Sequence, residues 1–316
     1  MQVLKDPELS RVNTDALKVR SCFYSGTGDN PIYVDHIPAS PKRSFRTPIV
    51  MLHGAFHTGS AYLATPDGRE GWAPFFAARG HDVYVVDWPG HGRSPADENF
   101  ARLSTESIAR SIAVLVNEVG PAIVLAHSAG GPLAWWIADN FPNKVAAIVG
   151  IAPGPPANIQ KSLPEDAASI EALRFDQSVG CPVYSSQNKT AYVNLDFIRS
   201  FWANGARFPK HAIETYAKSI VGESGKVLNE RFNIGGGGIR LSGPDTVAKR
   251  PILVVTGDSD LRHPREVDGA VARYFGAESL WLADHGICGN GHMLMIEDNS
   301  AEIATLIATW IDGKSL

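Results

Sequence analysis

Short apolar runs rich in β-branched residues alternate along the chain with longer segments of helical periodicity. The runs cover residues 48–54, 82–88, 122–128, 146–153, 251–258 and 278–284, and the helical patterns cover 71–80, 105–120, 131–142 and 301–311. Strands that alternate with helices pair in parallel, so the pattern predicts an α/β fold whose mostly parallel central sheet carries helices on both faces. The segments 16–24 and 31–37, which flank a Gly/Asp turn, predict an antiparallel pair before this sheet.

The alternation is interrupted at residues 154–249. This segment contains polar and aromatic helical pieces at 165–176, 195–204 and 209–220, and no strong buried strand. A structureless loop of that length is implausible inside a compact domain. We therefore predict a core formed by residues 1–153 and 250–316, with a mainly helical cap at 154–249. The glycine run 235–238 lacks a following Lys-Ser/Thr pair, so we expect it to return the chain to the sheet rather than to cradle a phosphate.

The composition is typical of a soluble globular protein, with 44% hydrophobic and 20% charged residues. The net charge of −4 argues against a nucleic-acid or anionic-membrane partner. The first residues lack the pattern of a secretory signal, and no apolar stretch approaches the roughly 18 residues of a membrane span. Cys22, Cys181 and Cys288 are too dispersed for a disulfide framework, which fits a reducing compartment. We therefore expect a cytoplasmic protein, either a monomer or a homodimer.

Ser128 stands where a buried run meets a helical segment. The surrounding sequence, L-A-H-S-A-G-G at 125–131, places small residues two positions before and two positions after the serine. A nucleophile elbow needs such residues, because its tight strand-to-helix turn brings backbone segments very close together. Ala126 stands where glycine is more usual. The start of a helix beside the serine also favours negative charge, so Ser128 is the candidate nucleophile.

Two further motifs precede the serine. His53-Gly54 ends one buried run, and D-W-P-G-H-G-R-S at 87–94 ends the next. In this order and spacing the motifs resemble those of the α/β-hydrolase superfamily, in its branch of capped esterases, lactonases and C–C hydrolases. The resemblance extends from about residue 17 to the C-terminus, except in the cap. It implies an oxyanion hole formed by the backbone amides of Ala55 and Ala129, and each such donor is typically worth about 2.7–4 kcal/mol in the transition state.

The resemblance also implies a catalytic histidine and a catalytic acid. In the family the histidine lies in a loop directly before the last helix, which selects His292 over His285. The acid lies three residues after the glycine of T-G-D-S-D at 256–260, which selects Asp260 and leaves Asp258 as the alternative. Ser128, Asp260 and His292 then follow the family order. A triad of this kind requires no metal and no organic cofactor.

Residues beside the predicted oxyanion hole are candidates to line the substrate site, namely Phe56, His57 and His127. His127 belongs to the elbow itself, so a structural role is the competing interpretation. His53 and His57 are four residues apart, but they follow a strand in a Gly-containing loop and no carboxylate accompanies them. We therefore predict no metal site.

The expected activity is hydrolysis of a small-molecule carboxylic ester through an acyl-enzyme. The whole chain also resembles bacterial hydrolases of monoalkyl phthalates, which implies a half-ester substrate with a free carboxylate. A C–C bond hydrolase or a lactonase would use the same triad and a similar cap, and both stay open. A non-catalytic binding member of the fold is the alternative from a different class, although such members normally lack a triad residue. An ordinary histidine pKa near 6.5 predicts activity that rises through about pH 6–8.

Overall fold

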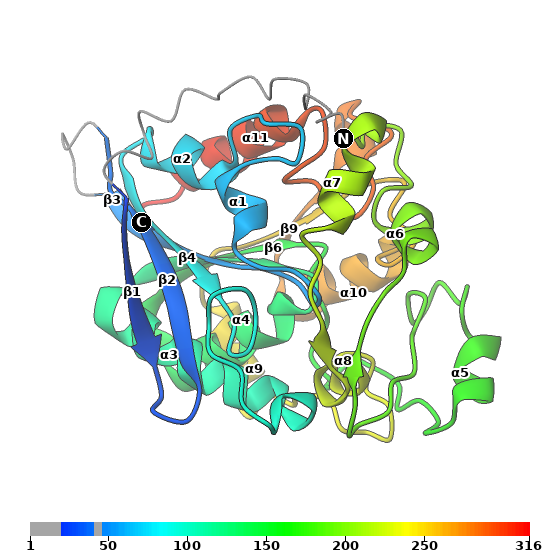
Figure 1. Ribbon diagram of the computed structural model, residues 1–316. Coiled ribbons are helices and arrows are strands. Elements are labelled where there is room, and N and C mark those ends of the chain that lie inside the picture. The colour runs from blue at the N-terminus through cyan, green and yellow to red at the C-terminus, as the bar shows by residue number, and fades with distance from the viewer. Residues whose placement is uncertain (1–19, 41–45) are drawn as a thin grey trace, which may run out of the picture.

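The computed structural model describes residues 20–40 and 46–316, and its centre is an eight-stranded sheet (Figure 1). Across the sheet the strands lie in the order β1-β2-β4-β3-β5-β6-β9-β10. Their bounds are Ser21–Gly26 (β1), Pro31–Ile37 (β2), Arg46–Leu52 (β3), His81–Asp87 (β4), Ala122–His127 (β5), Val145–Ile151 (β6), Ile252–Thr256 (β9) and Glu278–Trp281 (β10). Strand β2 is antiparallel to β1 and to β4, and every pair from β4 to β10 is parallel. This confirms the predicted sheet; residues 16–19 of the first predicted strand lie outside the described residues.

The order of the strands creates a crevice beside β5. From β3 the chain moves to β4 on one side, and it then returns to β5 on the other side of β3. In open α/β sheets, ligands bind outside the carboxyl ends of the strands at such a switch point. The loops that follow β3 and β5 therefore meet where a ligand site is expected.

Helices cover both faces of the sheet (Figure 1). One face carries α1 (Ser60–Leu63), α2 (Trp72–Ala77) and α11 (Ser300–Asp312), and the other carries α3 (Thr105–Val119), α4 (Gly130–Asn140), α9 (Pro244–Ala248) and α10 (Arg265–Phe275). This confirms the predicted layers. Within the described residues, no helix is long and apolar enough to cross a membrane.

Alternate residues of the central strands pack on opposite faces of the sheet. On β3, Ile49 and Met51 belong to the cluster that contains α2 and α11, whereas Val50 and Leu52 belong to the cluster that contains α3 and α4. All four side chains are fully buried. A slip of one residue would exchange the two sets, so the two cores together fix the register of the strand and the position of the loop after it.

Helix α10 is not among the helices that the sequence pattern predicts. Its buried side chains Val267, Val271 and Phe275 recur at helical spacing, but charged residues surround them. The apolar stripe is therefore narrow, and the helix becomes recognisable only when it packs against β9. A local signal is present at its end, where Gly276 takes a left-handed φ of 63° as helix-terminating glycines do.

Between β6 and β9 the chain forms short helices joined by irregular stretches, and α5–α8 lie together beside the sheet domain (Figure 1). The elements are α5 (Ala167–Ala172), β7 (Thr190–Ala191), α6 (Leu195–Phe201), α7 (Ile213–Ala217), β8 (Glu223–Ser224) and α8 (Gly225–Arg231). The helices are shorter than predicted, because side chains such as Trp202, Phe208 and Tyr216 pack into the core of the sheet domain. Tertiary packing rather than helical propensity holds such short helices. The division into a core and a cap stays a prediction.

Buried charges hold the turn that follows β4. The Asp87 carboxylate is fully buried and accepts hydrogen bonds from the amide of Gly59 (2.7 Å) and from N and Nε of Arg93 (3.0 and 2.8 Å). Arg93 also pairs with the buried Asp35 at 2.7 Å. The Ser94 hydroxyl donates to the carbonyl oxygen of Asp87 at 2.6 Å. The motif at 87–94 therefore builds a rigid turn.

Replacing Arg93 by methionine should destabilise the fold. The change leaves Asp87 without its cation and Asp35 with Arg20 alone. Because about a third of the Arg93 side chain is exposed, we expect a loss of about 3 kcal/mol, the lower end for a broken buried pair. Guanidinium unfolding followed by tryptophan fluorescence measures it. Arg110→Met, which breaks an exposed pair with Glu106, is the control and should lose under about 0.5 kcal/mol. Equal losses of stability in the two variants would contradict the conclusion that Arg93 holds the turn after β4.

Candidate active site

Ser128 lies on a sharp turn between β5 and α4. Its φ of 52° is left-handed, a conformation that costs a non-glycine residue on the order of 1 kcal/mol or more. Three backbone hydrogen bonds hold it. Ser128 N donates to the Ile151 oxygen (3.0 Å), and the amides of Gly131 (2.9 Å) and Gly154 (2.7 Å) donate to the Ser128 oxygen. A Cβ on Gly130 would lie 2.8 Å from the His53 carbonyl oxygen, so only glycine fits there. This is the geometry of a nucleophile elbow, and it presents the serine at the carboxyl end of the sheet.

Ser128, His292 and Asp260 form one hydrogen-bonded line. The Ser128 Oγ lies 3.1 Å from His292 Nε2, and His292 Nδ1 lies 2.7 Å from Asp260 Oδ2. Because the carboxylate accepts, Nδ1 carries the proton and Nε2 is left to accept from the serine hydroxyl. The second carboxylate oxygen accepts from the amides of Arg262 (2.8 Å) and His263 (3.1 Å), which fixes the acid. Nucleophile, base and acid thus have the arrangement that covalent catalysis requires.

Asp258, the alternative acid, has a different position. Its Oδ1 accepts hydrogen bonds from the amides of Gly289 (2.8 Å) and Asn290 (3.1 Å), in the loop before His292. The carboxylate therefore braces the histidine loop, and the structure brings Asp260 rather than Asp258 to the imidazole.

Burial and charge together set the protonation of the pair. Burial lowers the pKa of His292 below its ordinary value, although the adjacent Asp260 carboxylate opposes this effect. Burial alone would raise the pKa of Asp260, but the imidazole of His292 and the surrounding donors hold it below the usual value. The resting site therefore holds a neutral imidazole beside an ionised carboxylate, the state in which Nε2 can take a proton.

The loop after β3 faces the elbow. The Gly54 carbonyl oxygen is held by His53 Nδ1 (2.8 Å) and by the amide of His57 (3.3 Å). In a trans peptide the N–H points opposite to the C=O, so the Ala55 amide is directed away from these groups. A Cβ on Gly54 would lie 3.0 Å from the Ser128 Cβ, so the loop packs directly against the serine. Neither Ala55 nor Ala129 donates its amide to an acceptor in the described ranges, which leaves both amides available for an oxyanion.

His57 and His127 brace the site with both rings buried. His57 Nδ1 donates to the Ala55 carbonyl oxygen and its Nε2 accepts from the Tyr216 hydroxyl, each at 2.7 Å. Burial lowers the pKa of His57 to about 4, so the ring is neutral. His127 Nε2 donates to the carbonyl oxygen of His292 at 3.0 Å. These contacts give both histidines a structural role; their predicted part in substrate binding stays a prediction.

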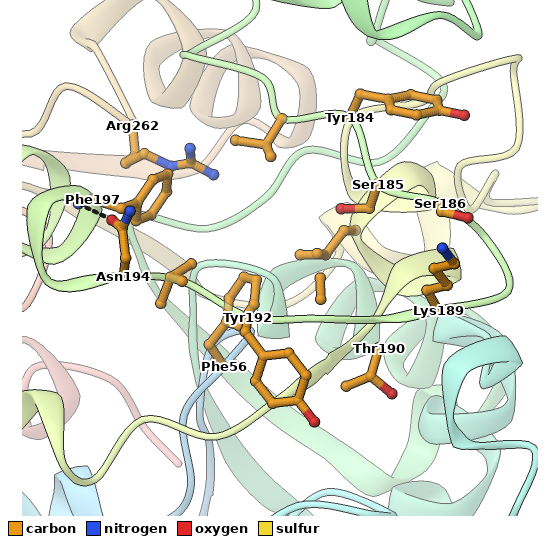
Figure 2. Close-up of a pocket in the computed structure, with 14 residues that line it drawn as sticks. Phe56, Tyr184, Ser185, Ser186, Lys189, Thr190, Tyr192, Asn194, Phe197 and Arg262 are labelled. Atoms are coloured by element: carbon orange, nitrogen blue, oxygen red, sulfur yellow. Dashed lines mark hydrogen bonds between the residues drawn. The ribbon is translucent and has the colours of Figure 1, made fainter.

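A cavity of about 500 Å³ begins at Phe56, the residue after Ala55 (Figure 2). Its walls include Tyr184, Tyr192 and Phe197, together with polar side chains of the 185–190 segment. Figure 2 shows the guanidinium of Arg262 directed toward this space, near Phe197. Arg262 Nη1 donates to the Cys181 oxygen at 2.9 Å, and no carboxylate of the described chain pairs with it. An aromatic pocket bordered by a cation that pairs with no carboxylate of the described chain can accept an apolar ligand that carries an acid group.

The sequence alone did not single out several residues that the structure brings to the site. Arg231 of α8 donates to His263 Nε2 at 2.7 Å, and His263 Nδ1 donates to Asp268 at 2.8 Å. Asp268 also accepts from the Thr256 hydroxyl at 2.6 Å. These residues stand behind Asp260, and their convergence comes from tertiary packing. The only local signal is that Arg262 and His263 lie two and three residues after the predicted acid.

Metal binding finds no support in the described part of the chain. No group of three or more histidine, cysteine, aspartate or glutamate side chains is arranged there to hold an ion. The three cysteines are free thiols, of which Cys181 is buried and Cys22 and Cys288 are exposed.

Comparison with known proteins places the chain in a family. A sequence model described as the alpha/beta hydrolase fold matches residues 47–298. The chain is 28% identical to the protein named Probable secreted lipase phiG, from a fungal species, over 94% of this chain and 90% of that protein. Among solved structures, an esterase from Exiguobacterium antarcticum gives a TM-score of 0.64 at 16% identity, covering 92% of this chain and 100% of that one. A thermophilic esterase from Thermogutta terrifontis gives 0.62 at 16% identity, covering 93% and 98%.

At these low identities the structural likeness shows the fold alone. The family match covers well over half of the chain and includes the elbow, the loop after β3 and the histidine loop. The chain therefore belongs to the α/β-hydrolase fold family.

Proposed function

We propose that the protein hydrolyses carboxylic esters of small molecules through an acyl-enzyme on Ser128. The observation that carries the proposal is the line from Ser128 Oγ through His292 to Asp260, with distances of 3.1 and 2.7 Å. The free amides of Ala55 and Ala129 supply the second requirement, because a tetrahedral intermediate needs donors for its oxygen. The similarity in sequence to a protein named as a probable secreted lipase supports ester substrates.

The reaction proceeds in two halves. His292 Nε2 takes the hydroxyl proton while Oγ bonds to the ester carbonyl carbon, and the carbonyl oxygen becomes an oxyanion that the two amides stabilise. The imidazolium then gives its proton to the departing alkoxide, which leaves as the alcohol and leaves the acyl group on Ser128. Water attacks this acyl group by the same sequence, releasing the acid and restoring the serine.

Removing the Ser128 hydroxyl should abolish turnover. Ser128→Ala should lower kcat by a factor on the order of 10⁶, because no covalent intermediate can form. A fluorescent fluorophosphonate probe, read on a gel, should label the wild type and not this variant. Ser279→Ala, which changes an exposed serine of β10, is the control and should label like the wild type. Labelling that persists in Ser128→Ala would show that another residue is the nucleophile.

The acidic limb of the pH profile should lie lower than an ordinary histidine predicts. His292 acts as a base only when neutral, and burial lowers its pKa below 6.5. Activity should therefore be retained as the pH falls to about 6.5 and be lost only as it falls through the lowered pKa. The rise should therefore lie at a lower pH than the unperturbed pKa predicts. The dependence of kcat/KM on pH with a non-ionising ester measures it, and a midpoint at or above about pH 6.5, the ordinary histidine value, would refute this role of burial.

We further propose that the substrate is a half-ester whose free carboxylate pairs with Arg262. The guanidinium borders the cavity and forms no salt bridge with a carboxylate of the described residues, and burial lowers the pKa of this arginine. A planar guanidinium suits a carboxylate, and the aromatic walls suit a ring or an alkyl chain. A monoalkyl ester of an aromatic dicarboxylic acid combines these features.

A half-ester and the matching neutral diester should reveal whether Arg262 favours a substrate with a free carboxylate. Arg262→Gln should lower kcat/KM for a monoalkyl phthalate about 10- to 100-fold, the worth of one hydrogen bond to a charged group, and change it less than about 3-fold for the neutral dialkyl ester. Lys189→Gln removes an exposed cation of the same cavity and is the control. An equal loss on both esters, or a larger loss in Lys189→Gln, would show that Arg262 does not bind a substrate carboxylate.

A further inference from the structure

A carboxylate from the segment between β6 and β9 is buried against the loop after β3. Glu223 of β8 is fully inaccessible to solvent. Its Oε2 accepts from the amide of Phe56 (3.1 Å) and faces His91 Nε2 (3.0 Å), and its Oε1 accepts from the amide of Ser224 (2.7 Å). A buried carboxylate is tolerated only when its oxygens are paired in this way. Three donors therefore converge on one side chain.

His91 supplies the charge that balances Glu223. His91 Nδ1 lies 3.0 Å from the carbonyl oxygen of Pro89, which can only accept, so Nδ1 carries a proton. Nε2 faces the carboxylate, so a proton lies there too. Burial would lower the pKa of His91, but the adjacent Glu223, with Asp87 further away, raises it overall. The ring of His53 lies with its centroid 5.4 Å from the centroid of the His91 ring. It stays neutral because burial lowers the pKa of His53.

Glu223 binds one of the two polar groups of a peptide bond that is held on both sides. The Ala55–Phe56 peptide has its carbonyl oxygen held by His57 and its amide held by Glu223. The Phe56 carbonyl oxygen accepts from the amide of Val221 at 2.9 Å, so the same segment holds the next peptide as well. Phe56 itself has a left-handed φ of 65°, which a phenylalanine adopts only when its surroundings enforce it.

We propose that Glu223 is a positioning residue for the oxyanion hole: its carboxylate locks the Ala55–Phe56 peptide and thereby aims the Ala55 amide at the oxygen of the tetrahedral intermediate. The inference rests on the proposed esterase function. It goes beyond the triad because it makes a side chain that contacts neither substrate nor Ser128 necessary for transition-state stabilisation. The Ala55 donor acts on the charge that develops in the transition state, so its misplacement lowers kcat and leaves KM nearly unchanged.

The test replaces the carboxylate by an isosteric amide. Glu223→Gln offers one acceptor and one NH2 group to three N–H donors, so at least one donor loses its partner. We expect kcat to fall at least 10-fold with KM within about 3-fold of the wild type, as for partial loss of one oxyanion donor. The affinity for a trifluoromethyl ketone, which forms an oxyanion on Ser128, should fall in parallel with kcat, whereas affinity for the product acid should not.

Glu230→Gln is the matched control. Glu230 lies in α8, seven positions along the same segment, is mostly buried, and accepts the amide of Thr105 at 2.7 Å without touching the loop after β3. The unfolding temperature of Glu230→Gln should change about as much as that of Glu223→Gln, but its kcat should stay within about 2-fold of the wild-type value. Glu223→Ala, with its folded fraction measured by circular dichroism, provides a second reading if the glutamine re-forms the contacts.

The outcomes separate the two proposals. If the wild type and Glu230→Gln hydrolyse no ester and take no fluorophosphonate label, the proposed function fails. If the wild type hydrolyses esters but folded Glu223→Gln and Glu223→Ala both keep kcat and ketone affinity within about 3-fold, Glu223 does not position the hole. A parallel fall in kcat and ketone affinity that Glu230→Gln does not share would establish the inference.

Discussion

Close backbone packing around Ser128 is the constraint on which the rest of the structure depends. The serine adopts a left-handed conformation while β3, β5 and β6 all contribute hydrogen bonds or contacts to its turn. Gly54 and Gly130 allow this approach because a side chain at either position would collide with the neighbouring loop. The parallel sheet supplies the rigidity, since its two cores hold the central strands in register. The strain at one residue is therefore carried by a large body of buried apolar contacts.

Much of this architecture could be predicted from the sequence. The central strands are recognisable because they are buried on both faces and read as continuous apolar runs, and small residues mark the elbow. Helix α10 could not be recognised, because its narrow apolar stripe matters only once β9 lies beneath it. The short helices between β6 and β9 were overestimated for a related reason. Their aromatic residues pack into the sheet domain instead of extending the helices.

The residues of the candidate site also fall into those that the sequence predicts and those that depend on tertiary packing. Ser128, Asp260 and His292 stand in motifs whose local sequence is informative, and the structure brings them into hydrogen-bonding distance. Asp258 is exposed and accepts from the loop before His292, whereas Asp260 is buried against the imidazole, and this difference depends on where that loop lies. Glu223 and Arg262 have no local signature. Each becomes significant only because the tertiary fold places it beside residues that are distant in the sequence. Neither periodicity nor motif spacing can predict such a contact.

One short stretch between β6 and β9 contacts both the loop after β3 and the loop that holds Asp260. Glu223 begins it and holds the loop after β3. Arg231 ends it and donates to the imidazole of His263, whose backbone amide donates to the carboxylate of Asp260. Residues 223–231 thus act as a brace between two loops that the sheet alone leaves independent. A consequence follows for the diversification of such enzymes. A chimaera in which all residues between β6 and β9 are exchanged would have to carry Glu223 and Arg231 as well, or the loop after β3 and the loop that holds Asp260 would lose their shared support.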